Sequence, residues 1–421
     1  MATPPAPGAR ALAPAVLTPQ ASERRIVFLI GAIQFINVLD FMMVMPLGPD
    51  FARALGIPSS KLGLVGGRYT AAAALAGIAG AFFLDRFDRR GALAVALAGL
   101  VAGTVAGGVA TGLATLLAAR VVAGAFGGPA AALSLAIVTD AVPPDRRGRA
   151  MGAVMSAFSI ASVLGVPAGL ELARIGGWRA PFFTVGALGA LIAAIAVTLL
   201  PRSPRPTATR AAATPFRDVL RRPIVLFALA AIAVAVIANF ALIPNLSAYL
   251  QFNLGYPRAH LGLLYLVGGA VSFGTMRLAG WLSDRYGAPT VAAGGSLGFI
   301  AVLAVGFIHP IASIPVLLIF VAFMVSGSFR FVPVQALSSR VPEPSERARF
   351  MSAQSAMQHL ASATGAMIGA YVLTERADGG LVGMDRLAWF AVATSLLLPI
   401  LLLAIDRRLR NRGAADVHAR A

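Results

Sequence analysis

The chain has 421 residues, of which 58% are hydrophobic and 12% charged, so it has too little polar surface for a soluble protein of this length and belongs in a lipid bilayer. Its net charge of +18 does not predict a nucleic-acid partner, because the basic residues are divided among short segments between apolar runs. The chain has no cysteine, and its only lysine, Lys61, precedes a leucine. Thiol chemistry, thiolate metal sites and P-loop ATP hydrolysis are therefore excluded, and we expect no metal and no cofactor.

Taken in chain order, the sequence predicts twelve apolar runs long enough to cross about 30 Å of hydrocarbon as helices. The predicted spans are 26–49, 62–84, 91–111, 114–138, 150–173, 179–200, 223–250, 260–283, 289–308, 313–338, 350–373 and 387–405. The predicted fold class is an all-α membrane protein with two six-helix halves, residues 23–200 and 223–406. Residues 1–22 are predicted to be a disordered tail, 201–222 a basic linker and 407–421 a C-terminal tail.

The two predicted halves repeat one another in sequence, which is the pattern of a duplicated bundle. The matched positions, 199 or 200 residues apart, are Asp85-Arg86 with Asp284-Arg285, Gly56 with Gly255, Gly165 with Gly365, and Gly169 with Gly369. An even number of spans puts both termini on one side, and 24 of the 35 basic residues lie on that side. By the positive-inside rule, both termini and the linker are expected to be cytoplasmic.

Polar side chains follow one arc of the first span, where Gln34, Asn37, Asp40 and Phe41 are separated by steps of one, three or four residues. Such a stripe is expected to face a water-filled cavity or another helix, because lipid offers no hydrogen bonds. Counted from the outer ends of their spans, Asp40 lies at a depth of about 15 Å and Arg120 at about 9 Å, which makes them candidate partners. They form either a proton switch or a static ion pair that fixes helix packing.

Neither Asp40 nor Arg120 has a residue of the same type at the corresponding position of the second half. Asp40 corresponds to Asn239 at an offset of 199, and Arg120 corresponds to Phe320 at an offset of 200. The second half therefore keeps a polar group but lacks the titratable one. This is the pattern expected if a proton site is restricted to the first half.

Other ionisable groups within the spans are functional-site candidates, because a charge at membrane depth is costly. Arg330, between Phe329 and Phe331, either binds an anionic or aromatic part of a substrate or extends to the membrane interface. A lone intramembrane histidine such as His359 is more often hydrogen-bonded and neutral than a proton carrier. The residues assigned to a substrate cavity are Gln34, Asn37, Phe41, Asn239, Arg330, Gln358 and His359.

Arg68 and Glu171 lie near the outer ends of their spans. They are expected either to join in an extracellular latch or to reach the lipid headgroups. Gly165 and Gly169 form a small-residue ridge on the fifth span, and such ridges let helices approach closely.

The charged turns carry a family resemblance. Gly280, Leu282, Asp284, Arg285 and Gly287 match the turn motif G-x-L-x-D-R-x-G of the major facilitator superfamily, and the likeness covers nearly the whole chain. In the first half Asp85, Arg86, Arg89 and Arg90 match, but Ala81 and Asp88 replace the two glycines. The resemblance implies that these turns, with Arg277, brace the two halves in the outward-open state.

Within that superfamily the chain resembles the drug:proton antiporters. Arg120 to Gly128 is similar to their fourth-helix motif, and Gly165, Pro167 and Gly169 are similar to their fifth-helix motif, with Val166 in place of a glycine. The resemblance implies that the first and fourth helices line the cavity. It also implies a bacterial-type inner membrane, a monomer, and the lipid bilayer, a small-molecule substrate and protons as partners.

The function expected from these features is proton-driven export of a small organic compound, with Asp40 and Arg120 as the coupling pair. A proton-coupled importer or a facilitator of sugars is the first alternative. A second is an intramembrane serine hydrolase, because Gly294 to Gly298 has the G-x-S-x-G pattern around Ser296, although a helix cannot supply the strand-turn-helix elbow. A third is a receptor without transport. No motif selects a substrate.

Overall fold

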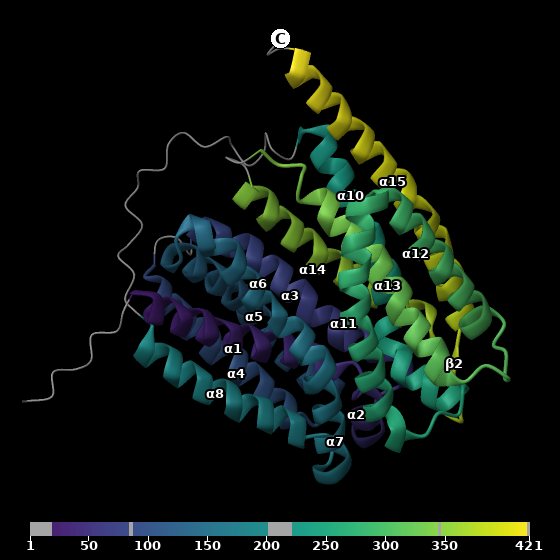
Figure 1. The fold of residues 1–421 in the computed structure, drawn as a ribbon. Coiled ribbons are helices and arrows are strands. Elements are labelled where there is room, and N and C mark those ends of the chain that lie inside the picture. Colours follow the sequence, from purple (N-terminus) through teal and green to yellow (C-terminus); the bar gives the residue numbers. More distant parts are fainter. Residues whose placement is uncertain (1–18, 84–86, 201–220, 344–346, 419–421) are drawn as a thin grey trace, which may run out of the picture.

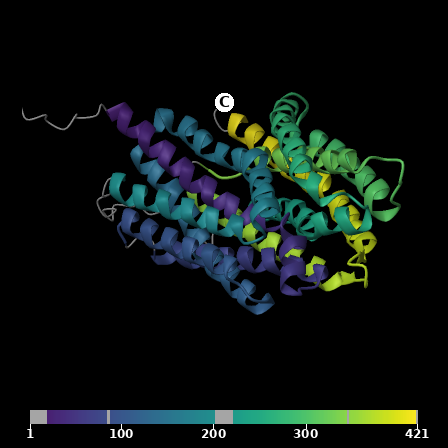
Figure 2. The same ribbon diagram turned by 90° about the horizontal axis from the view of Figure 1, so that it is seen from below.

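The computed structural model describes residues 19–83, 87–200, 221–343 and 347–418, almost all of them helical. Two helical bundles lie side by side, coloured purple to teal and green to yellow (Figures 1 and 2). The first bundle consists of α1 (Pro19–Val44), α2 (Gly48–Leu55), η1 (Ser59–Lys61), α3 (Leu62–Phe83), α4 (Arg89–Gly108), α5 (Leu113–Ala141), α6 (Pro144–Ile160), η3 (Ala161–Gly165), α7 (Val166–Gly176) and α8 (Ala180–Leu199).

The second bundle ends in the longest helix of the described chain. It consists of α10 (Pro223–Ala248), η4 (Tyr249–Asn253), η5 (Arg258–His260), α11 (Leu261–Tyr286), α12 (Ala288–Leu303), η6 (Ala304–Ile308), α13 (Val316–Ser338), α14 (Arg347–Val372), β1 (Thr374–Glu375), β2 (Leu381–Val382) and α15 (Met384–His418). The two strands pair antiparallel in a small hairpin between α14 and α15, with Thr374 opposite Val382.

Each of the twelve predicted spans corresponds to a long helix or to consecutive helical segments. Eleven are long and apolar enough to cross a membrane by composition, counting only described residues. The twelfth is α14, which has 26 residues and carries Gln354, Gln358 and His359 among its apolar positions. The chain is a multi-pass membrane protein with the expected arrangement of helices.

Proline accounts for the difference between the first predicted span and the first helix. The predicted span 26–49 is two elements, because α1 ends at Val44 and α2 starts at Gly48. Pro46 lies between them and has no backbone N–H to continue the helical ladder. At its other end, α1 begins at Pro19, within the segment 1–22 predicted to be a tail, and proline fits a first helical turn. The rest of that tail and residues 201–220 of the linker lie outside the described residues.

The last helix also runs further than the sequence predicts. It continues to His418, through most of the predicted tail 407–421. Its sequence there is rich in arginine and alanine, which favour helix, and Arg410 pairs with Asp406 one turn earlier at 2.9 Å.

The fifth span contains a π-helical turn, Ala161–Gly165, between α6 and α7. Pro167 is the second residue of α7, two positions after the turn ends. Since proline cannot donate to the carbonyl one turn back, the extra residue of a π turn accommodates the break in the ladder. The turn packs against α1 and α11, one in each half.

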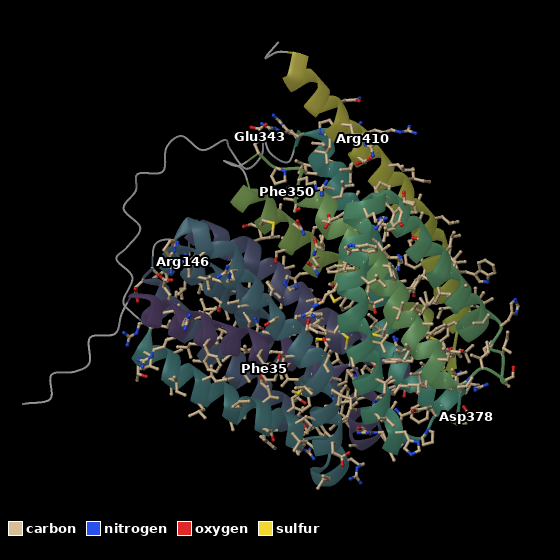
Figure 3. The ribbon with its side chains drawn as sticks, viewed as in Figure 1. Phe35, Arg146, Glu343, Phe350, Asp378 and Arg410 are labelled. Atoms are coloured by element: carbon tan, nitrogen blue, oxygen red, sulfur yellow. The ribbon has the colours of Figure 1, made fainter. Side chains whose placement is uncertain are left out.

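The bundle has two ends, which we name by their residues. The linker face carries Arg146, Glu343 and Arg410, and the distal face, at the opposite end of the second half, carries Asp378 (Figure 3). One apolar cluster contains residues of both halves, such as Phe51 of α2 and Leu246 of α10. The other two large clusters each belong to a single half. Their residues lie toward the linker face, so within the described part of the chain the two halves share a core only toward the distal face.

Candidate functional site

A buried ion pair joins α1 to α5. Arg120 Nη1 donates to both carboxylate oxygens of Asp40 at 3.1 Å, and Nη2 donates to the Asp40 carbonyl at 3.4 Å. The two side chains are 1% and 0% exposed. The structure thus brings together the two residues that the sequence suggested as partners. A pair buried this deeply needs further hydrogen bonds to offset the loss of water.

A hydroxyl group supplies one of these bonds. Thr104 Oγ1, on α4, lies 2.7 Å from Asp40 Oδ1 and 2.9 Å from the Leu100 carbonyl. A threonine hydroxyl has a single hydrogen and donates to one acceptor at a time. Thr104 can therefore stabilise the ionised carboxylate or turn to its own helix when Asp40 is neutral. Arg120 Nε has no hydrogen-bond partner among the described residues.

An aromatic ring closes the other side of Arg120. Its guanidinium carbon lies 4.5 Å from the centre of the Tyr69 ring, on α3. The Tyr69 hydroxyl donates to Asn37 Oδ1 at 3.0 Å, and Asn37 Nδ2 donates to the Gly127 carbonyl of α5 at 2.9 Å. All these groups belong to α1, α3, α4 and α5. The polar site of the first half is therefore a continuous network that contains Asn37 from the predicted stripe.

Phe41 links this network to the second half. Its ring stacks on Tyr69 at 5.3 Å and on Phe240 of α10 at 6.0 Å, measured between ring centres. The ion pair is thus one residue away from a contact between the halves. Gln34, one turn before Asn37 on α1, is buried, and its Oε1 has no hydrogen-bond partner in the described part of the chain.

The second half has a buried arginine of its own. Arg330, on α13, is 0% exposed. Its Nη1 donates to Asn239 Oδ1 of α10 at 3.3 Å, and its guanidinium carbon lies 4.2 Å from the centre of the Phe299 ring of α12. Nε and Nη2 have no partner among the residues that the structure describes. The predicted cavity residues Gln358 and His359 are half-buried on α14.

The turn motifs are stabilised by local contacts. Gly287 adopts φ +87°, which favours glycine, between α11 and α12. Asp284 pairs with Arg340 at 3.7 Å, and both are exposed. Arg285 lies 5.4 Å from the ring centre of Trp281. Each of these contacts lies within the second half.

One predicted member of this cluster is absent from it. Arg277 lies over the ring of Phe273, with its guanidinium carbon 4.3 Å from the ring centre, and is exposed. It is seven residues before Asp284, which is about 10 Å along a helix, so an aromatic ring one turn back is nearer. In this structure Arg277 therefore contacts Phe273 and not the turn, and its part in the turn of the outward-open state stays a prediction.

In the first half, Asp85 and Arg86 lie outside the described residues. Arg89 pairs with Asp140, at the end of α5, at 2.9 Å. Asp88, which replaces a motif glycine, caps α4 by accepting from the Gly91 N–H at 2.9 Å. The side chain thus has a structural role that glycine could not fill.

A second ion pair joins the halves at the distal face, and the sequence did not predict it. Arg258 Nε donates to Asp50 Oδ1 at 2.8 Å, and Nη2 donates to Asp50 Oδ2 at 2.5 Å and to the Leu170 carbonyl at 3.3 Å. The Ser59 N–H donates to Glu375, and Lys61 donates to the Ala370 carbonyl. At the linker face, by contrast, the ion pairs between described residues each join groups of one half.

The latch suggested by Arg68 and Glu171 does not form. Glu171 pairs with Arg174 of its own helix at 2.5 Å, and both are exposed. The Glu171 carboxylate is therefore balanced by Arg174 at the surface of α7 and is not a buried charge. Arg68 is exposed on α3.

The glycine positions of the fifth helix contact α1. A Cβ at Gly165 would lie 2.7 Å from Leu39 Cδ1, and one at Gly169 would lie 3.7 Å from Met43 Cβ. Pro167, between them, follows the π-helical turn. The motif thus combines close packing with an interrupted helix.

The family model of the Major Facilitator Superfamily matches residues 30–366 and 239–417. These matches cover most of the chain. The chain belongs to this superfamily. Its members are transporters, so the protein is a transporter and not an enzyme. Ser296 of the G-x-S-x-G pattern is buried within α12, where no strand-to-helix elbow exists.

Among curated relatives, the chain is 33% identical over 214 residues to a chloramphenicol resistance protein of Streptomyces lividans. That alignment covers 50% of this chain and 53% of the relative. The chain thus spans about half the length of this relative.

Among solved structures, it is similar to a bacterial homolog of the human lysosomal transporter Spinster in an inward-facing, occupied conformation, with a TM-score of 0.76, 19% identity and coverage of 91% and 97%. A D-xylose-proton symporter gives a TM-score of 0.69 with 17% identity and coverage of 91% and 97%. At these identities the likeness shows the fold.

Sequence reasoning missed Tyr69, Thr104 and the pair of Asp50 with Arg258. A tyrosine hydroxyl in an apolar span is a usable signal, because a buried hydroxyl needs a partner. Threonine gives little signal, since it is common in membrane helices and bonds its own backbone. Asp50 and Arg258 are 208 residues apart, and only the packing of the two halves brings them together.

Proposed function

We propose that the protein is a proton-coupled exporter of a small organic compound, in which Asp40 carries the proton. The observation that supports this most directly is the fully buried pair of Asp40 and Arg120, which lies in the first half only. The two bundles, residues 23–200 and 223–406, would rock about a central site, with 201–222 as the linker.

The linker face is assigned to the cytoplasm on the strength of its basic residues. With that orientation, the structure is closed to the outside. The distal face has the shared apolar core and the pair of Asp50 with Arg258, whereas the core divides between the halves toward the linker face. This is the arrangement of an inward-facing state.

In this proposal, protonation of Asp40 changes the net charge of the pair, and this change in charge favours movement of the helices. While Asp40 is ionised, Arg120 has a counter-charge within 3.1 Å. A proton on Asp40 would leave Arg120 buried with a positive charge and only Tyr69 and polar groups around it. An uncompensated buried charge costs several kcal/mol, so α5 must shift relative to α1 for protonation to be stable. Proton binding from outside and substrate binding from the cytoplasm would then favour opposite states.

Export is favoured over import by the name of a curated relative. A chloramphenicol resistance protein matches half of the chain at 33% identity, and resistance commonly reflects removal of the compound from the cell. The proposed cavity contains Gln34, Asn37, Phe41, Asn239, Arg330, Gln358 and His359.

The test is a pair of assays on Asp40→Asn and Arg120→Gln. We expect each variant to lose resistance to chloramphenicol in an efflux-deficient bacterium. In proteoliposomes, we expect native protein to move protons inward only when chloramphenicol moves outward, as followed with a pH-sensitive dye. Substrate movement without proton movement in Asp40→Asn would be direct evidence for the coupling role.

Glu171→Gln and Arg174→Gln are matched controls, because they remove the same charges from an exposed pair on α7. These variants are expected to behave like native protein. Native-level coupling in both Asp40→Asn and Arg120→Gln would rule out the assignment. Chloramphenicol uptake that follows the proton gradient would instead support the importer alternative.

A further inference from the structure

The buried arginine of the second half has an unused hydrogen-bonding edge. Arg330 Nη1 donates to Asn239, whereas Nε and Nη2 have no partner among the described residues. In arginine, Nε–H and one Nη–H of Nη2 point the same way and form a fork that fits the two oxygens of a carboxylate. The free donors of Arg330 are thus the pair suited to a planar anion.

The charge of Arg330 is also unbalanced. None of the ion pairs among described residues includes it, and its contacts are an amide oxygen at 3.3 Å and the face of the Phe299 ring. The buried arginine of the first half, Arg120, has a carboxylate in contact, at position 40, where the repeat puts Asn239 in the second half. A buried cation without an acidic partner favours an anion supplied from elsewhere.

Open space lies beside Asn239, the hydrogen-bond partner of Arg330. Asn239 and Gly327 are both half-buried, unlike Arg330. Gly327 is three residues before Arg330, so the two lie on one face of α13. A Cβ placed on Gly327 would have only Asn239 Nδ2 nearby, at 4.0 Å. The space beside the Asn239 amide is therefore open.

The same region meets the contact between the halves. Phe240, next to Asn239 on α10, stacks on Phe41 of α1. Asn239 therefore lies where a compound between the two bundles would touch the second half. Its amide nitrogen could donate a further hydrogen bond to an anion held by Arg330.

We propose that Arg330 is the anion-binding group of the substrate site, and that it selects organic carboxylates attached to an aromatic or apolar body. The carboxylate accepts from Nε and Nη2 of Arg330, and the body packs against aromatic side chains such as Phe41 and Phe240. This rests on the proposed transport function: among the small organic compounds proposed as substrates, it predicts that carboxylates bind better than neutral compounds such as chloramphenicol.

The experiment measures binding without transport. Purified full-length protein in neutral detergent is heated with 2-naphthoate or with 2-naphthamide, which has nearly the same shape and no charge. A ligand that binds the folded state raises the melting temperature. We expect millimolar naphthoate to raise the melting temperature of the native protein and naphthamide to raise it much less.

Two variants test the role of the guanidinium. Arg330→Gln is expected to weaken naphthoate binding by about tenfold or more, because two charge-assisted hydrogen bonds are lost. Arg330→Lys keeps the charge without the fork and should retain a fraction of the affinity. Arg68→Gln, which removes an exposed arginine of α3, is the matched control and should bind like native protein.

Asn239→Asp tests the proposal even if the arginine variants unfold. It places a carboxylate beside Arg330, as in the first half, and should abolish the preference for naphthoate over naphthamide. Equal stabilisation by the two probes, no stabilisation by naphthoate, or a retained preference in Asn239→Asp would each overturn the proposal.

The result is separable from that of the transport assays. Naphthoate binding that depends on Arg330, with no proton-linked flux in proteoliposomes, would leave the anion site in place and remove the transport proposal. Proton-linked export without any difference between naphthoate and naphthamide binding would support the transport proposal and overturn the anion site.

Discussion

The two halves of this transporter each bury an arginine beside the first helix of the bundle, but they balance its charge differently. In the first half, Arg120 binds the carboxylate of Asp40. In the second half, Arg330 binds the amide of Asn239, which occupies the corresponding position of the repeat. The carboxylate in one half and the amide in the other therefore leave the first site neutral and the second positive, although the two arginines are not matched by the repeat.

This difference separates two tasks within one architecture. A neutral pair changes its charge when a proton binds, so it can link proton occupancy to helix position. A positive site changes its charge when an anion binds, so it can link substrate occupancy to the same movement. A duplicated fold with identical sites could not assign the proton and the substrate to different halves.

The largest effect is expected from breaking the pair of the first half. Arg120→Gln or Asp40→Ala should lower the free energy of unfolding by about 3–5 kcal/mol, because each leaves a buried charge without a partner. The double variant, with both charges removed, should lose less than either single variant. Thermal unfolding of the four proteins in detergent measures the coupling. Additive losses would mean that the pair contributes no interaction energy.

The second effect concerns the glycines that the repeat shares. A Cβ at Gly365 would meet the Ile237 carbonyl of α10, which is backbone, whereas one at Gly165 would meet the flexible side chain of Leu39. Gly365→Ala should therefore destabilise by about 1–3 kcal/mol through overpacking, and Gly165→Ala by less. The melting temperatures of the two variants give the comparison.

Gly294→Ala is the control for these substitutions. No atom lies within 4 Å of a Cβ placed at Gly294, on α12. It should be neutral or slightly stabilising, because alanine favours a helix over glycine. Equal losses at positions 165 and 365 would show that the second half is not packed more tightly at this point.

The sequence was sufficient for the fold and for the central pair, and the reason is the membrane. The apolar runs are long and easily recognised in the sequence. An ionisable residue at membrane depth is rare, so the depths of Asp40 and Arg120 were enough to suggest them as partners. The division of the first predicted span at Pro46 was also within reach, because proline is a strong signal of a helix end.

What the sequence could not supply depends on contacts between distant segments. The distal ion pair needs Asp50 of α2 and Arg258 of η5 to meet across the two halves, and neither has a neighbouring motif. The contact that Arg277 makes in this structure could not be predicted for a related reason, since helical spacing gives a face but not the competing partner, which is Phe273. The contact of Tyr69 is of the same kind, because its hydroxyl bonds Asn37 of another helix, 32 residues away.

The third-largest effect is expected from a substitution that gives the second half a carboxylate beside its buried arginine, as in the first half. Asn239→Asp should stabilise the protein by about 1–2 kcal/mol, because a neutral hydrogen bond to Arg330 becomes a charge-assisted one and the buried charge is balanced. Thermal unfolding without any ligand measures it. Asn245→Asp, a buried asparagine of the same helix with no hydrogen-bond partner among the described residues, should destabilise. A loss of stability in Asn239→Asp would mean that Arg330 is already balanced by groups that the contacts above do not include.

The smallest effect is expected where the two halves meet. Asp50→Asn weakens the distal pair, whose side chains are 19% and 24% exposed, so we expect a shift of at most about 1 kcal/mol toward the state open at the distal face. The chain has no cysteine, so a single Ser60→Cys substitution provides a clean reporter at a buried residue beside Ser59. Labelling by a membrane-impermeant thiol reagent should become a few times faster with Asp50→Asn, since 1.4 kcal/mol corresponds to tenfold. Arg174→Gln, which breaks only the exposed pair within α7, should leave the labelling rate unchanged. If both substitutions speed labelling equally, the effect is general loosening of the distal face, and the pair of Asp50 with Arg258 does not hold the two halves together.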